Sequence, residues 1–420
     1  MVVARCLGWV LLVHQTLLVA VWDPSKLPPS PLDKSEFDYI VVGAGSAGSV
    51  VASRLSEDPN VTVLLLEAGE VDSQTEIHVP LAYVDLQLSP VDWAEQTVPQ
   101  KHACGGLEGR RARWPRGKVL GGSSSINAMI YVRGNREDYD RWREMGAEGW
   151  SYREVLPYFK KSEDFRGRGD DEFHGTGGYL TVSQSTQFRT LAARSFVEGT
   201  KELGYEEVDN NGRSQLGVSF PQYTIKDGWR LSTARAFLHP VRGNRENLYV
   251  VTGKSVRSLS FAPGASPTVD GVRVVDTKDC ANGEEKVVKA RREVILTAST
   301  VGTTKILLLS GIGPKGHLED VGIPVRADLP VGENLQDHIM VPVGYVAPRI
   351  PINETISLSE QHASESGRGT RVPGHWRRGR ENRPRFRHHL LRRKSRPEAH
   401  EEHQRIAGGG TANVWRGSNG

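Results

Sequence analysis

Three glycines stand between two runs of aliphatic residues near the start of the sequence. Gly43, Gly45 and Gly48 follow "YIVV" as G-x-G-x-x-G, and the apolar stretch "SVVASRL" comes next at helical spacing. This order predicts a buried strand, a tight turn and a helix whose N-terminal N–H groups face an anion. The first glycine permits the turn, the second leaves room for a pyrophosphate, and the third lets helix and strand pack closely.

An acidic residue stands at the end of the same strand–helix–strand unit. Glu67 ends the second aliphatic run, "VTVLLL", at a distance from Gly48 that is close to the roughly 20 residues expected for an acid that accepts from ribose hydroxyls. Its charge would repel a ribose phosphate, so the expected ligand is NAD or FAD rather than NADP. The fingerprint does not choose between these two, and an ordinary glycine turn is the alternative when the triplet is considered alone.

A second segment rich in glycine and serine could approach the same ligand. It reads "GKVLGGSSSINAMIYVRGNREDYDRW" from Gly117 to Trp142. Gly121 and Gly122 permit close backbone approach, and the three serines that follow offer hydroxyl and N–H groups. These features suit a second wall around a pyrophosphate.

This segment resembles the first signature of the glucose–methanol–choline (GMC) family of flavin oxidoreductases. The stretch "STVGTTKILLLSGIG" is similar to the second signature, except that the family has Pro or Ser at Thr304 and many members have Gly at Ser299. A third stretch, "PVGENLQDH" from Pro330 to His338, resembles a flavin-lining segment of the family. The resemblance covers about residues 37–345. Within the first signature, it matches at Gly117, Lys118, Leu120, Gly121, Gly122, Ser123, Ser124, Ile126, Asn127, Tyr131, Gly134 and Asp140.

The resemblance implies FAD, held without a covalent link, because the 121–127 segment lacks the histidine that links to FAD in some members. Val119 and Asn127 are expected against the flavin and its phosphates, Val256 against the adenine, and Asp337 near the ribityl chain. A helix cap, plain core packing and a loop ion pair are the alternatives for Asn127, Val256 and Asp337. The full cofactor-binding set is Gly43, Gly45, Ser46, Ala47, Gly48, Glu67, Val119, Gly121, Gly122, Ser123, Asn127, Val256 and Asp337.

The chemistry that the resemblance implies is oxidation of an alcohol or sugar CH–OH group. A histidine takes the hydroxyl proton while hydride passes to the flavin. In family members that histidine follows the last motif found here, so the catalytic residue of this chain stays unknown. His388 and His389 stand among arginines and match nothing in the family, and His338 is expected to be structural.

These motifs favour a FAD-dependent dehydrogenase or oxidase, similar to glucose dehydrogenase-like or choline dehydrogenase-like members. A small alcohol would be the substrate, and oxygen or a quinone would accept the electrons. Two alternatives stay open. One is a flavin-binding truncated isoform or pseudoenzyme, and the other is a non-enzymatic binding protein with a basic tail.

The elements that must position these residues indicate an α/β chain, α+β overall. We expect a FAD-binding Rossmann-like domain over residues 37–345, interleaved with an incomplete substrate-binding domain whose segments lie at about 150–230. Two amphipathic helices are predicted, from Ser151 and from Thr190. Strands of a meander are predicted in "NLYVVTGKSVRSLSF" and "VRVVDTKD", and a buried strand that leads into a helix is predicted in "REVILTAST".

The N-terminal residues suggest export. Residues 1–22 carry Arg5 and then an apolar stretch, which predicts a cleaved secretory signal, or a membrane anchor if the segment is retained. Residues 23–36 form a proline-rich linker. The expected location is therefore extracellular, with membrane anchoring as the alternative and membrane contact only if the leader is kept.

Residues 346–420 differ from the body in composition. Between Ser359 and Gly420 there are 14 basic and six acidic residues, whereas the rest of the chain has 40 and 44. We expect a disordered, non-native tail from altered splicing or a shifted frame, with a basic arm for nucleic acid or lipid as the alternative. The acidic body argues against a nucleic-acid partner. Outside the leader only Cys104 and Cys280 occur, and no pattern predicts a metal site.

Overall fold

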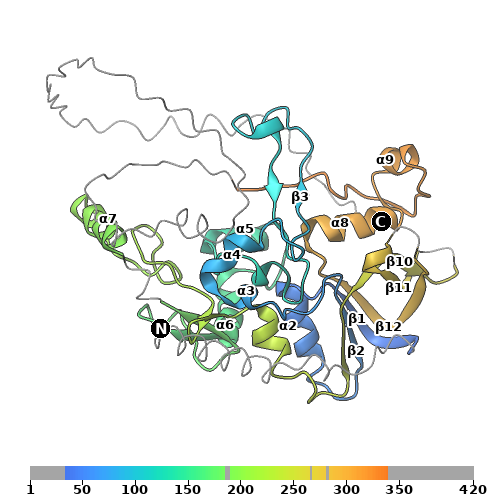
Figure 1. Ribbon diagram of the computed structural model, residues 1–420, viewed down its shortest axis with the longest axis horizontal. Helices are drawn as coiled ribbons and strands as arrows, with labels where there is room; N and C mark the ends of the chain where they lie inside the picture. Colours follow the sequence, from blue (N-terminus) through green and yellow to red (C-terminus); the bar gives the residue numbers. More distant parts are fainter. Residues whose placement is uncertain (1–33, 185–189, 265–266, 281–282, 339–420) are drawn as a thin grey trace, which may run out of the picture. The chain divides into compact units, whose positions relative to one another are not determined.

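The described chain contains a six-stranded sheet with the strand order β10-β11-β12-β1-β2-β9. Figure 1 labels its strands β10, β11, β12, β1 and β2. The computed structural model describes residues 34–184, 190–264, 267–280 and 283–338, all within one structural unit. Neighbouring strands run parallel from β12 (Lys286–Leu296) through β1 (Glu36–Val42) and β2 (Val63–Leu66) to β9 (Leu248–Val251). β10 (Lys254–Phe261) and β11 (Val269–Asp276) add the antiparallel meander that the sequence predicts. This mixed α/β arrangement confirms the expected fold class.

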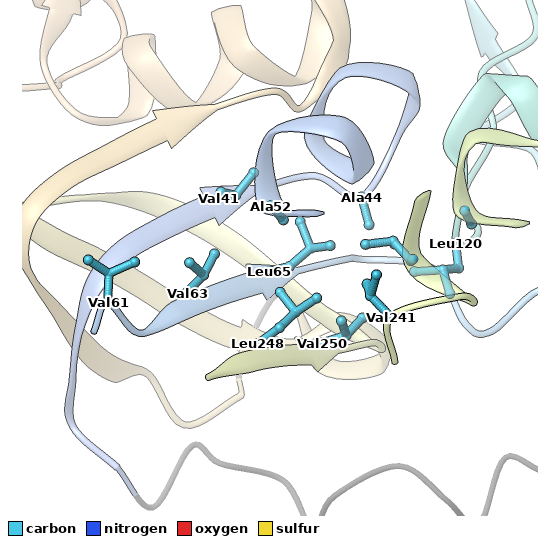
Figure 2. Close-up of a cluster of buried hydrophobic side chains, with 12 residues drawn as sticks. Val41, Ala44, Ala52, Val61, Val63, Leu65, Leu120, Val241, Leu248 and Val250 are labelled. Atoms are coloured by element: carbon cyan, nitrogen blue, oxygen red, sulfur yellow. The ribbon is translucent and has the colours of Figure 1, made fainter. Parts of the chain in front are cut away.

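β1 and β2 occupy the middle of the sheet because they are apolar on both faces. Val63–Leu66 is buried throughout and pairs in register with Tyr39–Val42. Continuous aliphatic runs of this kind are typical of parallel strands that are covered on both sides. Figure 2 shows the cluster on one face, formed by Val41, Ala44, Ala52, Val61, Val63, Leu65, Leu120, Val241, Leu248 and Val250 with Ala234 and Leu238.

Two helices begin directly after parallel strands. α2 (Ser46–Leu55) follows β1, as the glycine triplet predicts, and its Ala52 packs in the cluster of Figure 2. α8 (Ser299–Leu309) follows β12, and its Ile306 is buried in the cluster on the other face. Because β1 and β12 are parallel neighbours, both helix N-termini lie at the same edge of the sheet.

β12 is less buried than the sequence predicts. The residues Val294–Leu296 at its C-terminal end are only half-buried. Within the described chain, β11 pairs with β12 only over Lys286–Lys289, so the C-terminal half of β12 has β1 as its one strand neighbour. This partial pairing is the physical reason why β12 is less buried than its aliphatic run predicts.

Shorter elements complete the described chain. The helices predicted from Ser151 and Thr190 are confirmed as α6 and α7. β5 pairs parallel with β6, and β7 pairs antiparallel with β8, as two ribbons apart from the main sheet. The interleaved second domain remains a prediction. The bounds are α3 (Thr75–His78), α4 (Tyr83–Leu86), β3 (Glu95–Gln96), β4 (Arg113–Trp114), α5 (Arg136–Glu144), α6 (Tyr152–Ser162), β5 (Glu163–Arg166), β6 (Leu180–Ser183), α7 (Leu191–Glu202), β7 (Ile225–Lys226), β8 (Trp229–Arg230), β13 (Ile312–Gly313), α9 (Lys315–Asp320) and β14 (Ala327–Asp328).

Several predictions concern residues outside the described ranges. These are the leader at 1–22, most of the linker at 23–36, the tail at 346–420, and His388 and His389. None of the helices in the described ranges has both the length and the apolar character needed to cross a bilayer. Cys104 and Cys280 are both free thiols.

A buried charged cluster holds together the segment between β4 and β7. The Arg133 guanidinium pairs with Glu163 at 2.8 Å, and both side chains are almost fully buried. His174 Nδ1 lies 3.1 Å from the same carboxylate, and its Nε2 lies 2.7 Å from Asp209. Burial opposes the charge of His174, but hydrogen bonds to Asp209 and Glu163 outweigh it and raise its pKa to about 9. The ring also stacks on Phe165 with 3.6 Å between centroids.

This raised pKa predicts a pH-dependent stability. The stabilisation from protonated His174 is complete below its ordinary pKa of 6.5 and is lost as the pH rises through about 9. We expect the free energy of unfolding, measured by urea denaturation, to fall across this window in the wild type. The fall should be shallower in His174→Gln and unchanged in His317→Gln, which alters an exposed histidine of α9. Parallel curves for His174→Gln and the wild type would refute the assignment.

Candidate functional site

A cavity of about 580 Å³ opens at the edge of the sheet where β1, β2 and β12 end. The N-terminal turns of α2 and α8 border it, together with the first residues of β10. Glu67, at the end of β2, lies on its wall. Ligands of parallel α/β sheets bind at this edge, where strands give way to helices.

The two glycine-rich segments meet at this cavity. Gly121 N donates to the carbonyl of Ala44 at 2.8 Å. A Cβ on Gly122 would lie 2.6 Å from the Cα of Gly45, and Gly122 has a φ of +54°, which favours glycine. Residues 43–48 and 121–123 therefore form two adjoining walls of one site, although about 75 residues separate them in the sequence.

Gly43 and Gly48 explain why the first turn can be so tight. Gly43 has a φ of +99°, and a Cβ at that position would lie 2.6 Å from the carbonyl oxygen of Thr297. A Cβ on Gly48 would lie 1.9 Å from the carbonyl oxygen of Gly43. Hence α2 packs against β1 and the start of α8 at a distance that only glycine allows.

The two helices at the cavity begin without side-chain caps. In the described structure, neither α2 nor α8 has a capping hydrogen bond from a side chain or an acid in its first turn. Away from the cavity, Asn135 caps α5 and Thr190 caps α7. Free N–H groups and two positive helix ends therefore face the cavity, which suits a diphosphate.

Glu67 is held in place by backbone groups. Its Oε2 accepts from Ala44 N and its Oε1 from Gly69 N, both at 2.8 Å. Burial raises the pKa of Glu67 to about 7, although these N–H groups oppose the shift. Each carboxylate oxygen keeps a further lone pair, so the group can also accept from a ribose hydroxyl.

The structure brings most of the predicted site residues to this cavity. Ser46 and Ala47 are exposed at the start of α2, and Val256 lies on β10. The predicted residues that line the cavity are Gly43, Gly45, Ser46, Ala47, Glu67, Gly122, Ser123 and Val256. The shape and the donors of this wall fit a dinucleotide.

Five predicted residues are not part of the lining. Gly48, Val119 and Gly121 are buried behind the wall and shape it from there. Asn127 Oδ1 accepts from Met129 N at 3.0 Å, and this hydrogen bond closes a turn within the loop that follows Ser125. Asp337 is exposed and accepts from His338 N at 2.8 Å. The roles that the resemblance implies for these residues remain predictions.

Sequence reasoning missed several lining residues. Lys254, Arg257, Lys305 and Arg116 bring positive charge to the cavity, which suits an anionic ligand. Glu95 also lines it, and its buried Oε2 has no hydrogen-bond partner among the described residues. The start of β10 and the ribbon β3–β4 carry no short motif, so only their positions in space identify them. The lining residues at the start of α8 could have been predicted from the sequence, because they belong to the second signature.

Ser299, where the sequence departs from the second signature, has a strained backbone. Its φ is +64°, a conformation that costs an L-residue roughly 1–2 kcal/mol. α8 nevertheless begins at Ser299. Glycine would adopt this conformation without that strain.

Comparison with known proteins gives consistent results. Residues 37–340 match the family described as GMC oxidoreductase. The chain is 42% identical over 307 residues to a glucose dehydrogenase (FAD, quinone) of Drosophila pseudoobscura pseudoobscura, covering 72% of this chain and 48% of that protein. It is 44% identical over 305 residues to an oxygen-dependent choline dehydrogenase of Rhizobium etli, covering 72% of this chain and 53% of that protein.

A solved structure shares the fold. The crystal structure of pyridoxine 4-oxidase from Mesorbium loti superposes with a TM-score of 0.64 at 36% identity, covering 70% of this chain and 55% of that one. The chain thus spans about half the length of the curated relatives it matches.

The close contact at Gly48 predicts a large effect of one methyl group. Gly48→Ala should lower the free energy of unfolding by roughly 3 kcal/mol or more, because the added Cβ meets backbone that cannot move aside. Gly105→Ala is the matched control, since a Cβ there would have open space, and it should change stability by less than about 0.5 kcal/mol. Urea denaturation measures both. Equal stabilities would show that the turn is looser than described.

Proposed function

This chain belongs to the GMC oxidoreductase family, and on that premise we propose that it binds FAD non-covalently and acts in the oxidation of a CH–OH group. One observation carries the proposal: the contact between Gly45 and Gly122 beside two uncapped helix N-termini. The relatives named above support FAD as the ligand and an alcohol or sugar as the class of substrate.

The cavity lining offers groups for the diphosphate, the adenosine ribose and the adenine of the cofactor. The N–H groups at the start of α2, from Gly45 to Ala47, would bind the diphosphate, with the start of α8 adding its positive end. Glu67 would accept from the adenosine ribose. Val256, on β10, would meet the adenine through its backbone, and Gly122 and Ser123 would close over the diphosphate toward the flavin.

Bound FAD would supply the acceptor for the hydride that leaves the alcohol carbon. The residues of this chain would then orient the cofactor and hold its charge. Backbone N–H groups that are fixed by helices can bind the constant charge of the diphosphate without rearranging. The base that takes the hydroxyl proton is not assigned.

A second candidate function is flavin binding without turnover. The relatives named above, which are dehydrogenases, do not favour it. Oxygen or a quinone is the proposed electron acceptor in the catalytic case. The apolar leader supports secretion as the proposed location, with a membrane anchor as the alternative.

The visible spectrum of the purified full chain tests the function. We expect bound flavin absorbance that trichloroacetic acid releases, since the link is non-covalent. Anaerobic addition of choline, glucose or a primary alcohol should bleach the absorbance if the chain oxidises alcohols. Absorbance that none of these compounds bleaches would support flavin binding without turnover. A colourless folded protein that FAD does not colour would overturn the proposal.

The raised pKa of Glu67 predicts pH-dependent FAD affinity. The ionised carboxylate is the better acceptor for a ribose hydroxyl, and in the free protein it forms as the pH rises through about 7. Affinity should therefore rise roughly tenfold between pH 6 and pH 8. Glu67→Gln should remove this dependence, whereas Glu198→Gln, an exposed change on α7, should keep it. Quenching of flavin fluorescence measures the affinity, and a slope retained in Glu67→Gln would contradict the role.

A further inference from the structure

Arg230 is fully buried and binds to the segment behind the cavity wall. Its relative exposure is 0%. Its Nη1 donates to the carbonyl of Asn127 at 2.6 Å, to Asn127 Oδ1 at 3.0 Å and to the carbonyl of Ser124 at 3.2 Å. Its Nε donates to the carbonyl of Ile77 at 2.6 Å. Arg230 thus joins the loop 124–127 to the C-terminal end of α3.

The charge of Arg230 is not balanced by an acid. None of the carboxylates in the described ranges forms an ion pair with it, and its Nη2 has no hydrogen-bond partner there. Arg133, the other deeply buried arginine of this region, pairs with Glu163. Burial lowers the pKa of Arg230 to about 10, so the guanidinium still carries its charge at neutral pH. Buried charges are normally paired, so an unpaired one calls for a functional reason.

The position of Arg230 relative to the cavity suggests that reason. Gly122 and Ser123 line the cavity, and the next residue, Ser124, contacts Arg230. The short segment 230–233, which includes Arg230, contacts both glycine-rich walls. Thr233 N donates to Ser124 Oγ at 3.0 Å, and Thr233 Oγ1 donates to the carbonyl of Gly45 at 3.4 Å. The guanidinium is therefore in contact with a residue next to the wall, and it does not itself line the cavity.

We propose that Arg230 is a positioning residue for the bound flavin. It fixes the loop 124–127 and places an unbalanced positive charge behind that loop, which favours the reduced flavin over the oxidised flavin. The inference rests on the proposed function, because it requires FAD in the cavity.

The electrostatic part follows from the charge change of the reaction. Hydride transfer brings two electrons and one proton to the flavin, so the reduced cofactor gains one negative charge. The alcohol loses that hydride and its hydroxyl proton, and leaves as the carbonyl compound. A fixed cation nearby stabilises the added charge, and the interaction is stronger in a buried site than in water. For a two-electron couple, a tenfold preference for the reduced form corresponds to about 30 mV.

Substitution of Arg230 separates the charge from the packing. Arg230→Gln keeps a hydrogen-bond donor but removes the charge, and Arg230→Lys keeps the charge but loses the forked geometry. In the full chain with FAD bound, the midpoint potential is measured by dye-coupled reductive titration. We expect a tenfold or larger loss of preference for reduced flavin in Arg230→Gln, and a potential much closer to that of the wild type in Arg230→Lys. A purely structural role would not produce this rescue.

Hydrogen exchange of the cofactor-free chain tests whether Arg230 fixes the loop 124–127. Both variants should increase exchange at residues 124–127, because neither restores all four hydrogen bonds. If Arg230→Gln does not fold, the midpoint potential is measured on the variant Asn127→Asp instead. That change places a carboxylate against the guanidinium and balances its charge while keeping Arg230, so it should also lower the potential.

The outcomes distinguish this inference from the proposed function. A wild-type chain that binds no FAD would overturn both. A wild-type chain that binds FAD, with an unchanged potential in Arg230→Gln or in its substitute Asn127→Asp, would overturn the charge role alone. Equal losses in Arg230→Gln and Arg230→Lys would show that Arg230 acts through packing, and would also overturn it.

Discussion

The approach of Gly122 to Gly45 is the constraint on which the site depends. The two backbones can come this close because Gly122 has no side chain, since a Cβ there would lie 2.6 Å from the Cα of Gly45. The contact brings together segments from distant parts of the sequence. The buried aliphatic strands β1 and β2 fix one segment, and Thr233 ties the other to it through Ser124 and Gly45. The cavity therefore results from backbone packing, with side chains adding charge and selectivity around it.

Much of this arrangement was predictable from the sequence. Gly43, Gly45, Gly48 and Glu67 occur at spacings that a strand, a turn and a helix impose, so local geometry is enough to place them. The meander and the helices α6 and α7 carry clear periodicity. The partial burial of β12 was not predictable, because it depends on how far β11 runs beside β12. Pairing between distant strands has no local signal in the sequence.

The residues that sequence reasoning missed share a physical cause. Lys254 and Glu95 reach the cavity from segments without a motif, and Arg230 contacts carbonyl groups of other segments. Such contacts depend on the tertiary fold and not on spacing. Asp337 shows the opposite case, since its motif is clear but the described structure leaves it exposed.

The uncapped ends of α2 and α8 have a consequence for the protein in the cell. Two positive helix ends that border the same cavity repel each other, and an anion bound between them removes that repulsion. The cofactor is then a component of the folded state, adding about 2.7 kcal/mol when its concentration is a hundred times the Kd. The chain with cofactor bound would therefore unfold, and be cleaved by proteases, less readily than the chain without it.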